Sequence, residues 1–509
     1  MSRISAALCM ALGATLLTAC GSDSTTAPVS ETFARGTLIA NPPARVASAD
    51  VAYLTGQLSA STTGQQLIAL AGTPVCGVDV YYLQYWTIGD QNDVIMDSGA
   101  LMVPTGSAAQ CSGSRPLVMY AHGTQFQQNA NMADIGNPND PAYEESLIIA
   151  TIYAAQGYIV VAPNYAGYDT STLTHHPYLN QQQNAADMID ALTAARSALP
   201  NTFTPQTTAS GALFVAGYSE GGYVAMATAK ALQAAGTPVT AMAGGSGPYA
   251  LEATFDAVFY GSPPIGGTYF SPLVTTSYQA AYGNIYTQTT DIYAPQYADG
   301  IDTLLPSLTP IATLVSDGKL PPNALFDSTT PVTPYPSLTA ALAVPANPVF
   351  AAGFGNPYLI INDYRLNYVL DAVANPDGAV PTPTAGVPLA ANPQNTLRIA
   401  LKANDLRSWV PGSPILMCGS TLDPTVFFST NAEVMAAYWA AQGVPSELYT
   451  LLDLNATPNP ASPFAPLQVG FQTSEAAILA SSEEQWVSTY HENELPFCMV
   501  AARGFFAAL

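Results

Sequence analysis

A glycine-rich pentapeptide directly after an apolar run constrains this chain more than any other feature. Residues 212–216 (Ala-Leu-Phe-Val-Ala) have the pattern of a short buried strand, and 217–221 (Gly-Tyr-Ser-Glu-Gly) follow it at once. A helix-forming stretch covers 223–232. A strand, Gly-x-Ser-x-Gly and a helix in this order are typical of a strained turn that lifts one hydroxyl clear of the backbone. The pattern predicts a nucleophile at Ser219; the alternative is a glycine-rich turn without chemistry.

Composition limits the classes of function that such a chain can have. The 509 residues are 49% hydrophobic and 9% charged, which provides apolar material for a large core. With 35 acidic and 12 basic residues the net charge is −23. This balance argues against nucleic-acid binding, because phosphate contacts require a basic face.

The N-terminus has the pattern of an export signal. Arg3 precedes an apolar stretch over 4–17, which suits a signal-peptide core but is too short to span a membrane. The stretch ends in Leu-Thr-Ala-Cys-Gly at 17–21, which resembles the lipobox of bacterial lipoproteins. The resemblance implies a signal peptide over 1–19, a lipid anchor on Cys20, a tether to residue 50, and a place in the outer membrane or at the cell surface, facing periplasm or exterior. Ordinary secretion, with Cys20 lost or free, is the alternative.

Four further cysteines remain beyond this segment, at Cys76, Cys111, Cys418 and Cys498. An even number in an exported chain predicts two disulfide bonds. Three pairings are open. We favour Cys76–Cys111, which closes the region before the apolar run at Leu117, together with Cys418–Cys498, for which the reason is functional and is given below.

Strands and helices alternate along the first half of the chain. Two strand-like runs, 80–88 and 99–103, flank a turn-forming segment and predict an antiparallel hairpin. Buried-strand patterns then alternate with helical spacing, at 116–121, 158–163, 183–199 (helical), 212–216 and 239–244. This rhythm predicts a mostly parallel, doubly wound α/β sheet, with ligand chemistry at the carboxyl ends of its strands.

The rhythm stops after residue 245 and resumes near residue 414. The intervening stretch is rich in Pro, Tyr and Ala and is far too long for a loop. We expect an inserted cap over the active site at 246–412, between a first part of the core at 51–245 and a second part at 413–509. Within the second part, strands are expected at 414–419 and 448–452, and helices at 431–442, 473–490 and 497–509.

A serine nucleophile needs a base that takes its proton and an acid that orients the base. The chain has four histidines: His122, His175, His176 and His491. His491 follows the last expected strand and precedes the terminal helix, where the base of such a fold is found. Asp423 follows the strand that resumes the sheet and is the favoured acid, with Asp453 as runner-up. Capping of a following helix is the ordinary role for Asp423.

Negative charge that develops on a substrate carbonyl needs N–H donors aimed at it. The first expected donor is the backbone of Glu220, the residue after the nucleophile. The second lies in the loop over 121–125, where we choose the N–H of Thr124, with Gln125 next. His122 is expected to stabilise this turn. A bond between Cys418 and Cys498 would tie the loop of the acid to the loop of the base.

Together these pieces resemble the α/β-hydrolase superfamily, and within it the capped branch of secretory lipases and related bacterial esterases. The matching segments, spread over about 80–509, are 122–124, 161–167, 176–179, 217–222, Asp423 and His491. Asn164 stands where relatives often carry Asp, which puts any loop-bracing role of that acid in doubt. The resemblance implies hydrolysis of carboxylic esters through an acyl-enzyme, without metal or organic cofactor. Acyl or aryl esters are the expected substrates, and the sequence leaves open whether lipids or polyesters are among them.

Two other functions remain open at this stage. One is a serine peptidase of the same fold, although the sequence shows no evident clamp for a peptide terminus. The other is a surface lipoprotein that binds a partner without catalysis. A serine, an acid and a histidine in the expected order favour the ester hydrolase.

Overall fold

The computed structural model describes residues 34–202 and 206–509, and Ala34–Leu509 forms one compact unit. The predicted signal peptide, Cys20 and the predicted tether as far as residue 33 lie outside the described residues. In the part of the chain that is described, no helix combines the length and the apolarity needed to cross a bilayer.

A nine-stranded sheet forms the centre of this unit, in the order β1-β2-β3-β5-β4-β6-β7-β10-β11. The strands are β1 (Ala44–Ala49), β2 (Gly77–Ile88), β3 (Val94–Thr105), β4 (Gly113–Ala121), β5 (Ile159–Pro163), β6 (Thr207–Tyr218), β7 (Ala241–Gly245), β10 (Ile415–Gly419) and β11 (Tyr449–Asp453). β2 and β3 form the predicted antiparallel hairpin, and the strands from β5 to β11 run parallel. The predicted fold class, a mostly parallel α/β-hydrolase sheet, is confirmed.

The sheet begins earlier than expected. β1 pairs antiparallel with β2, so residues 44–49 belong to the core and not to a tether that reaches residue 50. Helices α1 (Val51–Ser59) and α2 (Thr62–Ala71) follow it. The Ala-Arg-Val-Ala-Ser-Ala strand is largely exposed, which leaves little of the alternation by which a half-buried strand is recognised.

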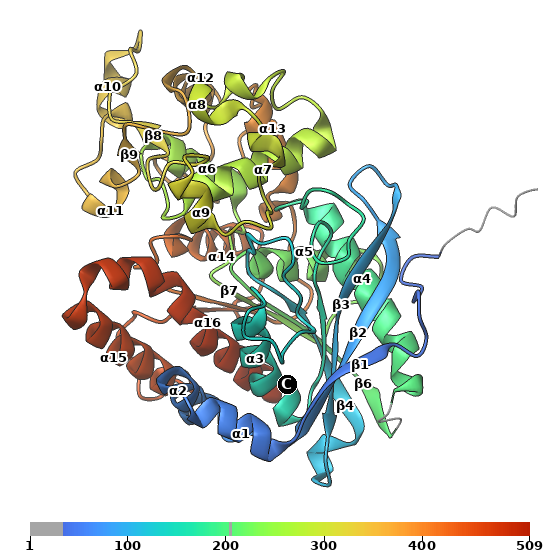
Figure 1. Ribbon diagram of the computed structural model, residues 1–509. Coiled ribbons are helices and arrows are strands. Elements are labelled where there is room, and N and C mark those ends of the chain that lie inside the picture. Colours follow the sequence, from blue (N-terminus) through green and yellow to red (C-terminus); the bar gives the residue numbers. More distant parts are fainter. Residues whose placement is uncertain (1–33, 203–205) are drawn as a thin grey trace, which may run out of the picture. The chain divides into compact units, whose positions relative to one another are not determined.

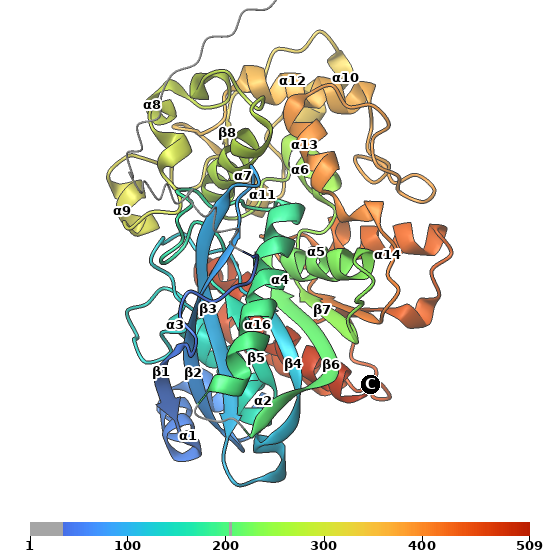
Figure 2. The same ribbon diagram turned by 90° about the vertical axis from the view of Figure 1, so that its right-hand side faces the viewer.

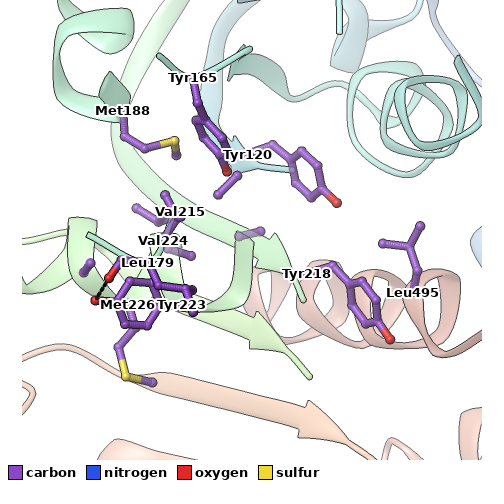
Figure 3. Packing of buried hydrophobic residues seen from close by; sticks show 14 of the residues in the cluster. Tyr120, Tyr165, Leu179, Met188, Val215, Tyr218, Tyr223, Val224, Met226 and Leu495 are labelled. Atoms are coloured by element: carbon purple, nitrogen blue, oxygen red, sulfur yellow. Dashed lines mark hydrogen bonds between the residues drawn. The ribbon is translucent and has the colours of Figure 1, made fainter. Parts of the chain in front are cut away.

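Helices cover both faces of the sheet (Figures 1 and 2). α4 (Gln181–Ala198) and α5 (Glu220–Ala234) lie on one face, and α3 (Tyr143–Ile152) and α16 (Glu483–Ala507) on the other. Between them β6 is buried along its carboxyl half. Figure 3 shows this packing, in which Val215 of β6 lies among Met188, Tyr223 and Val224, while Tyr218 faces α16. The elbow after β6 is thus fixed from two sides.

The C-terminal helices differ from the expected ones. α14 (Ala432–Ala441) matches its prediction, but the two helices predicted at 473–490 and 497–509 are replaced by α15 (Ala465–Ser481) and α16. The break falls at Ser482, whose side chain accepts a hydrogen bond from the Gln485 N–H and caps α16. Pro496 lies inside α16, so the helix continues through this proline and does not begin after it.

The chain between β7 and β10, which we call the insertion, forms a separate group of helices beside the carboxyl ends of the parallel strands (Figure 1). Its helices are α6 (Leu251–Tyr260), α7 (Gly267–Tyr282), α8 (Pro295–Ala298), α9 (Ile311–Ser316), α10 (Pro336–Leu342), α11 (Pro348–Ala351), α12 (Asn362–Ala374) and α13 (Thr396–Asn404), with a short parallel pair β8 (Phe326–Asp327) and β9 (Phe354–Gly355).

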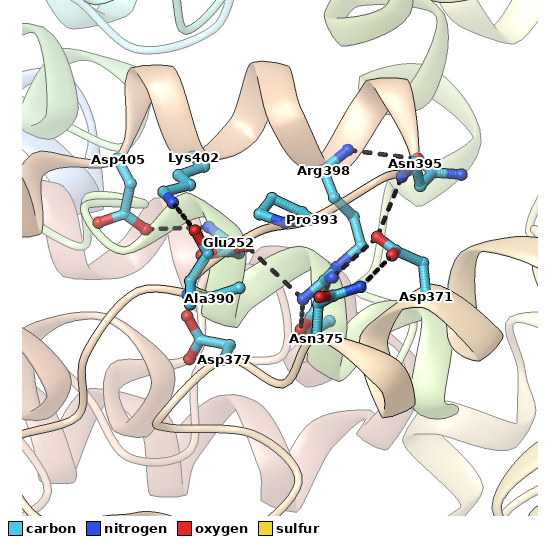
Figure 4. Close-up of polar contacts among 12 residues, drawn as sticks. Glu252, Asp371, Asn375, Asp377, Ala390, Pro393, Asn395, Arg398, Lys402 and Asp405 are labelled. Atoms are coloured by element: carbon cyan, nitrogen blue, oxygen red, sulfur yellow. Dashed lines mark hydrogen bonds and ion pairs between the residues drawn. The ribbon is translucent and has the colours of Figure 1, made fainter.

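Buried ion pairs hold the insertion together (Figure 4). Arg398 of α13 reaches Asp256 of α6 at 2.8 Å and Asp371 of α12 at 3.0 Å. Arg407, just after α13, pairs with Asp377 at 2.6 Å and with Asp405 at 2.8 Å. Both guanidinium groups are completely buried. Arg398 therefore joins helices far apart in sequence, with a third carboxyl, that of Glu252, 3.5 Å away, and Arg407 joins the segment of Asp377 to the turn after α13.

Candidate active site

Ser219 occupies a strained turn between β6 and α5. Its φ of 56° and ψ of −125° lie in a region that a non-glycine residue rarely adopts, and such strain is typical of functional turns. A Cβ on Gly217 would lie 2.0 Å from the Gly221 carbonyl oxygen, and one on Gly221 would lie 2.0 Å from that of Ala121. Both glycines are therefore required by close backbone contacts, and the turn that they permit presents the Ser219 hydroxyl.

His491 and Asp423 complete a continuous chain of hydrogen bonds with this hydroxyl. His491 Nε2 lies 2.8 Å from Ser219 Oγ, and His491 Nδ1 lies 2.7 Å from Asp423 Oδ2. The Asp423 side chain is fully buried and that of His491 is 12% exposed. Because ionised Asp423 can only accept, Nδ1 carries the hydrogen, and Nε2 is free to accept from the serine.

His491 lies within α16, not on a loop before a terminal helix as we expected. The Tyr218 hydroxyl donates a hydrogen bond to the His491 carbonyl oxygen, which joins this turn of α16 to the residue before Ser219. The helix and this hydrogen bond hold the backbone of His491, while Asp423 holds its imidazole.

Asp423 faces His491 and does not cap a helix, because the next two helical elements, Phe428–Thr430 and α14, have Phe427 and Asn431 at their N-caps. Its Oδ1 accepts hydrogen bonds from the N–H groups of Thr425 and Val426, while Oδ2 faces His491. Asp453, the runner-up, instead accepts from Thr421 and Asn455. It braces the loop of Asp423 and does not contact His491.

The expected donor loop lies beside the nucleophile. A Cβ on Gly123 would be 3.7 Å from Ser219 Cβ, and Glu145 fixes the loop by accepting a hydrogen bond from the Gly123 N–H at 2.9 Å. Neither the Thr124 N–H nor the Glu220 N–H has an acceptor among the described residues. The Gln125 N–H likewise has no acceptor among these residues, while its carbonyl oxygen accepts from Tyr168. All three expected donors, Thr124, Gln125 and Glu220, therefore remain candidates for binding an oxyanion.

The other three histidines do not reach Ser219. The ring nitrogens of His122 face the carbonyl oxygens of Gly123 and Asn164, in line with the expected support of the turn. His175 Nε2 pairs with Asp90 at 3.0 Å, away from the serine.

His176 has a contact that the sequence did not reveal. Its Nε2 lies 2.6 Å from Glu220 Oε1, and both side chains are fully buried. Its Nδ1 lies 2.9 Å from the Ala166 carbonyl oxygen, so Nδ1 must donate, and a second proton is shared between Nε2 and Glu220. The pair fixes the first residue of α5, whose N–H is the candidate oxyanion donor.

Asn164 does brace neighbouring loops, although it stands in place of an acid. Its Nδ2 donates to Ser98 Oγ at 2.9 Å and to Asn131 Oδ1 at 3.1 Å, and its Oδ1 accepts from the Met132 N–H at 2.8 Å. An amide can donate and accept at once, which a carboxylate cannot.

An apolar pocket opens beside Ser219 and extends into the insertion. It encloses about 660 Å³ of space that atoms do not fill, part of it open to solvent. Much of its wall comes from α6 and α7, with Phe255, Val258, Phe259, Phe270 and Val274. These residues were missed by the sequence analysis. Their signal was helical spacing, 255 with 258 and 259, and 270 with 274, but this pattern equally describes a helix that packs against a core.

Both expected disulfide bonds are present. Cys76–Cys111 closes a separation of 35 residues, and Cys418–Cys498 one of 80 residues. The second bond joins the end of β10, five residues before Asp423, to α16, seven residues after His491. The predicted covalent connection between the segments that carry Asp423 and His491 is therefore present.

One group of residues has the spacing of a metal site. Asp423, His491 and Glu494 offer ligand atoms within 4.8 Å of one another. However, His491 Nδ1 already donates to Asp423, and a metal would have to displace this hydrogen. The cluster is accounted for by hydrogen bonding.

Known structures share this fold. No family model matches the sequence, and a comparison with curated proteins gives no match. The rice cell wall degrading esterase LipA from Xanthomonas oryzae is similar over 92% of this chain and 98% of its own, with a TM-score of 0.65 and 24% identity. A ligand-bound form of that esterase gives 0.63 and 25% identity over 90% and 97% of the two chains. The chain is therefore a protein of the α/β-hydrolase fold that resembles a known esterase.

Proposed function

We propose that this protein is a serine carboxylic-ester hydrolase that acts through an acyl-enzyme. The observation that carries the proposal is the unbroken chain of hydrogen bonds from Ser219 Oγ through both nitrogens of His491 to Asp423. The likeness to a known esterase supports the reaction class.

In this mechanism His491 Nε2 takes the proton of Ser219 as Oγ attacks the ester carbonyl carbon. The oxyanion that forms accepts hydrogen bonds from the N–H groups of Glu220 and Thr124. His491 then gives its proton to the departing alcohol oxygen, which leaves an acyl group on Ser219. Water, deprotonated by His491, hydrolyses this acyl-enzyme. Throughout, Asp423 keeps the imidazole oriented and stabilises its charged form.

The pocket supports an ester with an apolar acyl group. Its wall beyond Ser219 is almost entirely aliphatic and aromatic, and its one ionisable carboxyl, that of Glu220, is paired with His176. A peptidase that captures a peptide terminus needs a free charge of the opposite sign, and no residue that lines this pocket supplies one. We therefore place ester hydrolysis before peptide hydrolysis.

Substitution of Ser219 tests the proposal. Ser219→Ala should lower kcat on p-nitrophenyl esters by about 10³-fold or more, His491→Ala by a similar factor and Asp423→Asn by less. His175→Ala is the matched control and should leave kcat unchanged. Wild-type protein should also react with a fluorophosphonate probe at Ser219, which a non-catalytic binding protein would not do. Substantial turnover by purified, folded Ser219→Ala protein would disprove the assignment.

We also propose export and lipid attachment at Cys20, on the strength of the lipobox-like sequence at 17–21. The proposed location is the outer membrane or the cell surface. Cys20→Ala should then move the full-length protein from the detergent phase to the aqueous phase after membrane extraction. Retention of the variant in the detergent phase would mean that another part of the chain provides the anchor.

A further inference from the structure

A second carboxyl group, with no assigned role, lies behind the candidate triad. Glu494 is in α16, one helical turn after His491, and its side chain is completely buried. One of its oxygens, Oε2, forms a short hydrogen bond with Ser246 Oγ, in the residue that follows β7. The contact joins the turn of α16 that carries His491 to the carboxyl edge of the sheet.

Several acids surround Glu494, and no cationic side chain forms an ion pair with it in the described residues. Asp423 faces it from the loop after β10, Asp453 from the end of β11 and Glu475 from α15. His491, on its own helix, is already hydrogen-bonded to Asp423. Among the ion pairs of the described residues, none joins a Lys or Arg to Glu494. An ionised carboxylate in this place would be desolvated and would repel Asp423.

The second oxygen of Glu494 also favours a protonated, neutral carboxyl group. Oε1 is buried and has no hydrogen-bond partner among the described residues. An anionic oxygen without a donor is far more costly to bury than the carbonyl oxygen of a neutral acid. A proton on Oε2 can occupy the contact with Ser246, because a hydroxyl oxygen accepts as well as donates. In agreement, burial and then the charge of Asp423 raise the pKa of Glu494 well above its usual value.

We propose that Glu494 is a positioning residue that works as a neutral carboxylic acid: through Ser246 it holds the His491 turn of α16 against the end of β7. This rests on the proposed function of His491. Because the acid is neutral, His491 faces one negative charge and not two. A second anion would hold the imidazole in its charged form, in which it cannot accept the proton of Ser219.

The proposal predicts that residue 494 must form the hydrogen bond to Ser246 and must be uncharged. Glu494→Gln keeps the shape and a donor for Ser246 but has no proton to lose. Its kcat at neutral pH should stay within about threefold of wild type, whereas removal of both oxygens in Glu494→Leu should lower kcat by about tenfold or more. Ser246→Ala, which removes the same hydrogen bond from the other side, should resemble the Leu variant in direction.

The pH profile separates this role from a purely structural one. The wild-type kcat/KM should fall on the alkaline side as Glu494 loses its proton, and in Glu494→Gln this fall should be absent or moved upward by about one pH unit or more. A loss of about tenfold or more by folded Glu494→Gln at neutral pH, or identical alkaline limbs in the two proteins, would overturn the proposal.

Thermal unfolding tests the proposal without relying on activity. A raised folded-state pKa stabilises the protein below the unfolded value, and this stability is lost as the pH rises through the folded value. From about pH 4.5, the ordinary pKa of a glutamate, upward, the Tm of wild type should therefore fall more steeply with pH than that of Glu494→Gln. If the wild type hydrolyses no ester at any pH, the proposed function fails, yet this comparison still decides whether Glu494 is neutral. Parallel Tm curves would contradict the neutral acid.

Discussion

The insertion and the base of the candidate site bury carboxyl groups in two different ways. In the insertion, Arg398 and Arg407 each lie between two carboxylates at 2.6–3.0 Å. In the part of the fold around the sheet, Glu494, Asp97 and Asp187 are buried, and none of them forms an ion pair with a Lys or Arg of the described residues. Burial raises the pKa of Asp97 to about 6 and that of Asp187 well above its usual value.

The difference shows that a buried acid needs either a cation or a proton. Where a guanidinium is present, the carboxyl can remain charged: burial raises the pKa of Asp371, but hydrogen bonds from the Asn395 N–H and from Arg398 more than offset this and lower it. Where no cation is present, the acid keeps its proton to a higher pH than usual. The insertion should therefore depend on its arginines, and the site region on pH.

The largest expected effect is on the cationic side of this comparison. Arg407→Met would leave Asp377 and Asp405 buried without their counter-charge, and should lower the free energy of unfolding by about 3–5 kcal/mol. The control is Lys319→Met, because Lys319 is exposed and its substitution should change the free energy of unfolding by about 0.5 kcal/mol or less. Urea unfolding measures both. Equal, small losses would show that the buried pairs do not stabilise the insertion.

The next effect concerns the covalent link in the site region. Loops of 80 and 35 residues predict that each disulfide contributes about 4 kcal/mol in the chain-entropy model, less where native strain opposes it. Replacement of Cys418 and Cys498 by Ala should lower both Tm and kcat, since acid and base lose their connection. The matched change at Cys76 and Cys111 should lower Tm alone. Equal losses of kcat in the two variants would remove any special role for Cys418–Cys498.

The smallest expected effect concerns Glu252, a buried acid that lies near an arginine and still has a raised pKa. Glu252 is 3.5 Å from Arg398, yet burial raises its pKa to about 8, since Asp377 and Asp256 add negative charge and the Ala390 N–H and Arg398 offset this only in part. The folded protein thus holds this proton more tightly than the unfolded chain. The stability that results is complete below about pH 4.5 and is lost as the pH rises to about 8.

In Glu252→Gln the free energy of unfolding should fall less steeply with pH. The difference in slope should be up to about 1.4 kcal/mol per pH unit, the value for one proton. Unfolding at several pH values measures the slope, and Glu447→Gln, at an exposed position, is the control. A slope unchanged by Glu252→Gln would mean that Arg398 keeps Glu252 charged.

Much of the candidate site follows from local pattern. Gly217, Ser219 and Gly221 identify the elbow because its close backbone contacts allow few other residues. The order of serine, acid and histidine follows from the order of the strands. Asp423, however, follows β10, and Asp453 is the last residue of β11. These strands are adjacent and parallel, so both acids lie at the same edge of the sheet. Sequence alone could not show which of the two acids contacts His491, because this depends on the direction in which each side chain points.

By itself, the sequence determined the α/β-hydrolase sheet, the strained turn of Ser219 and the small set of partners for it, because strand burial and turn sterics depend on residues near in the chain. Tertiary structure decided that His491 belongs to a continuous helix, that α6 and α7 line the pocket, and that Glu494 lies among acids. These features depend on which distant segments exclude water from one another. Desolvation, which sets the charge of a buried group, has no local signature in the sequence.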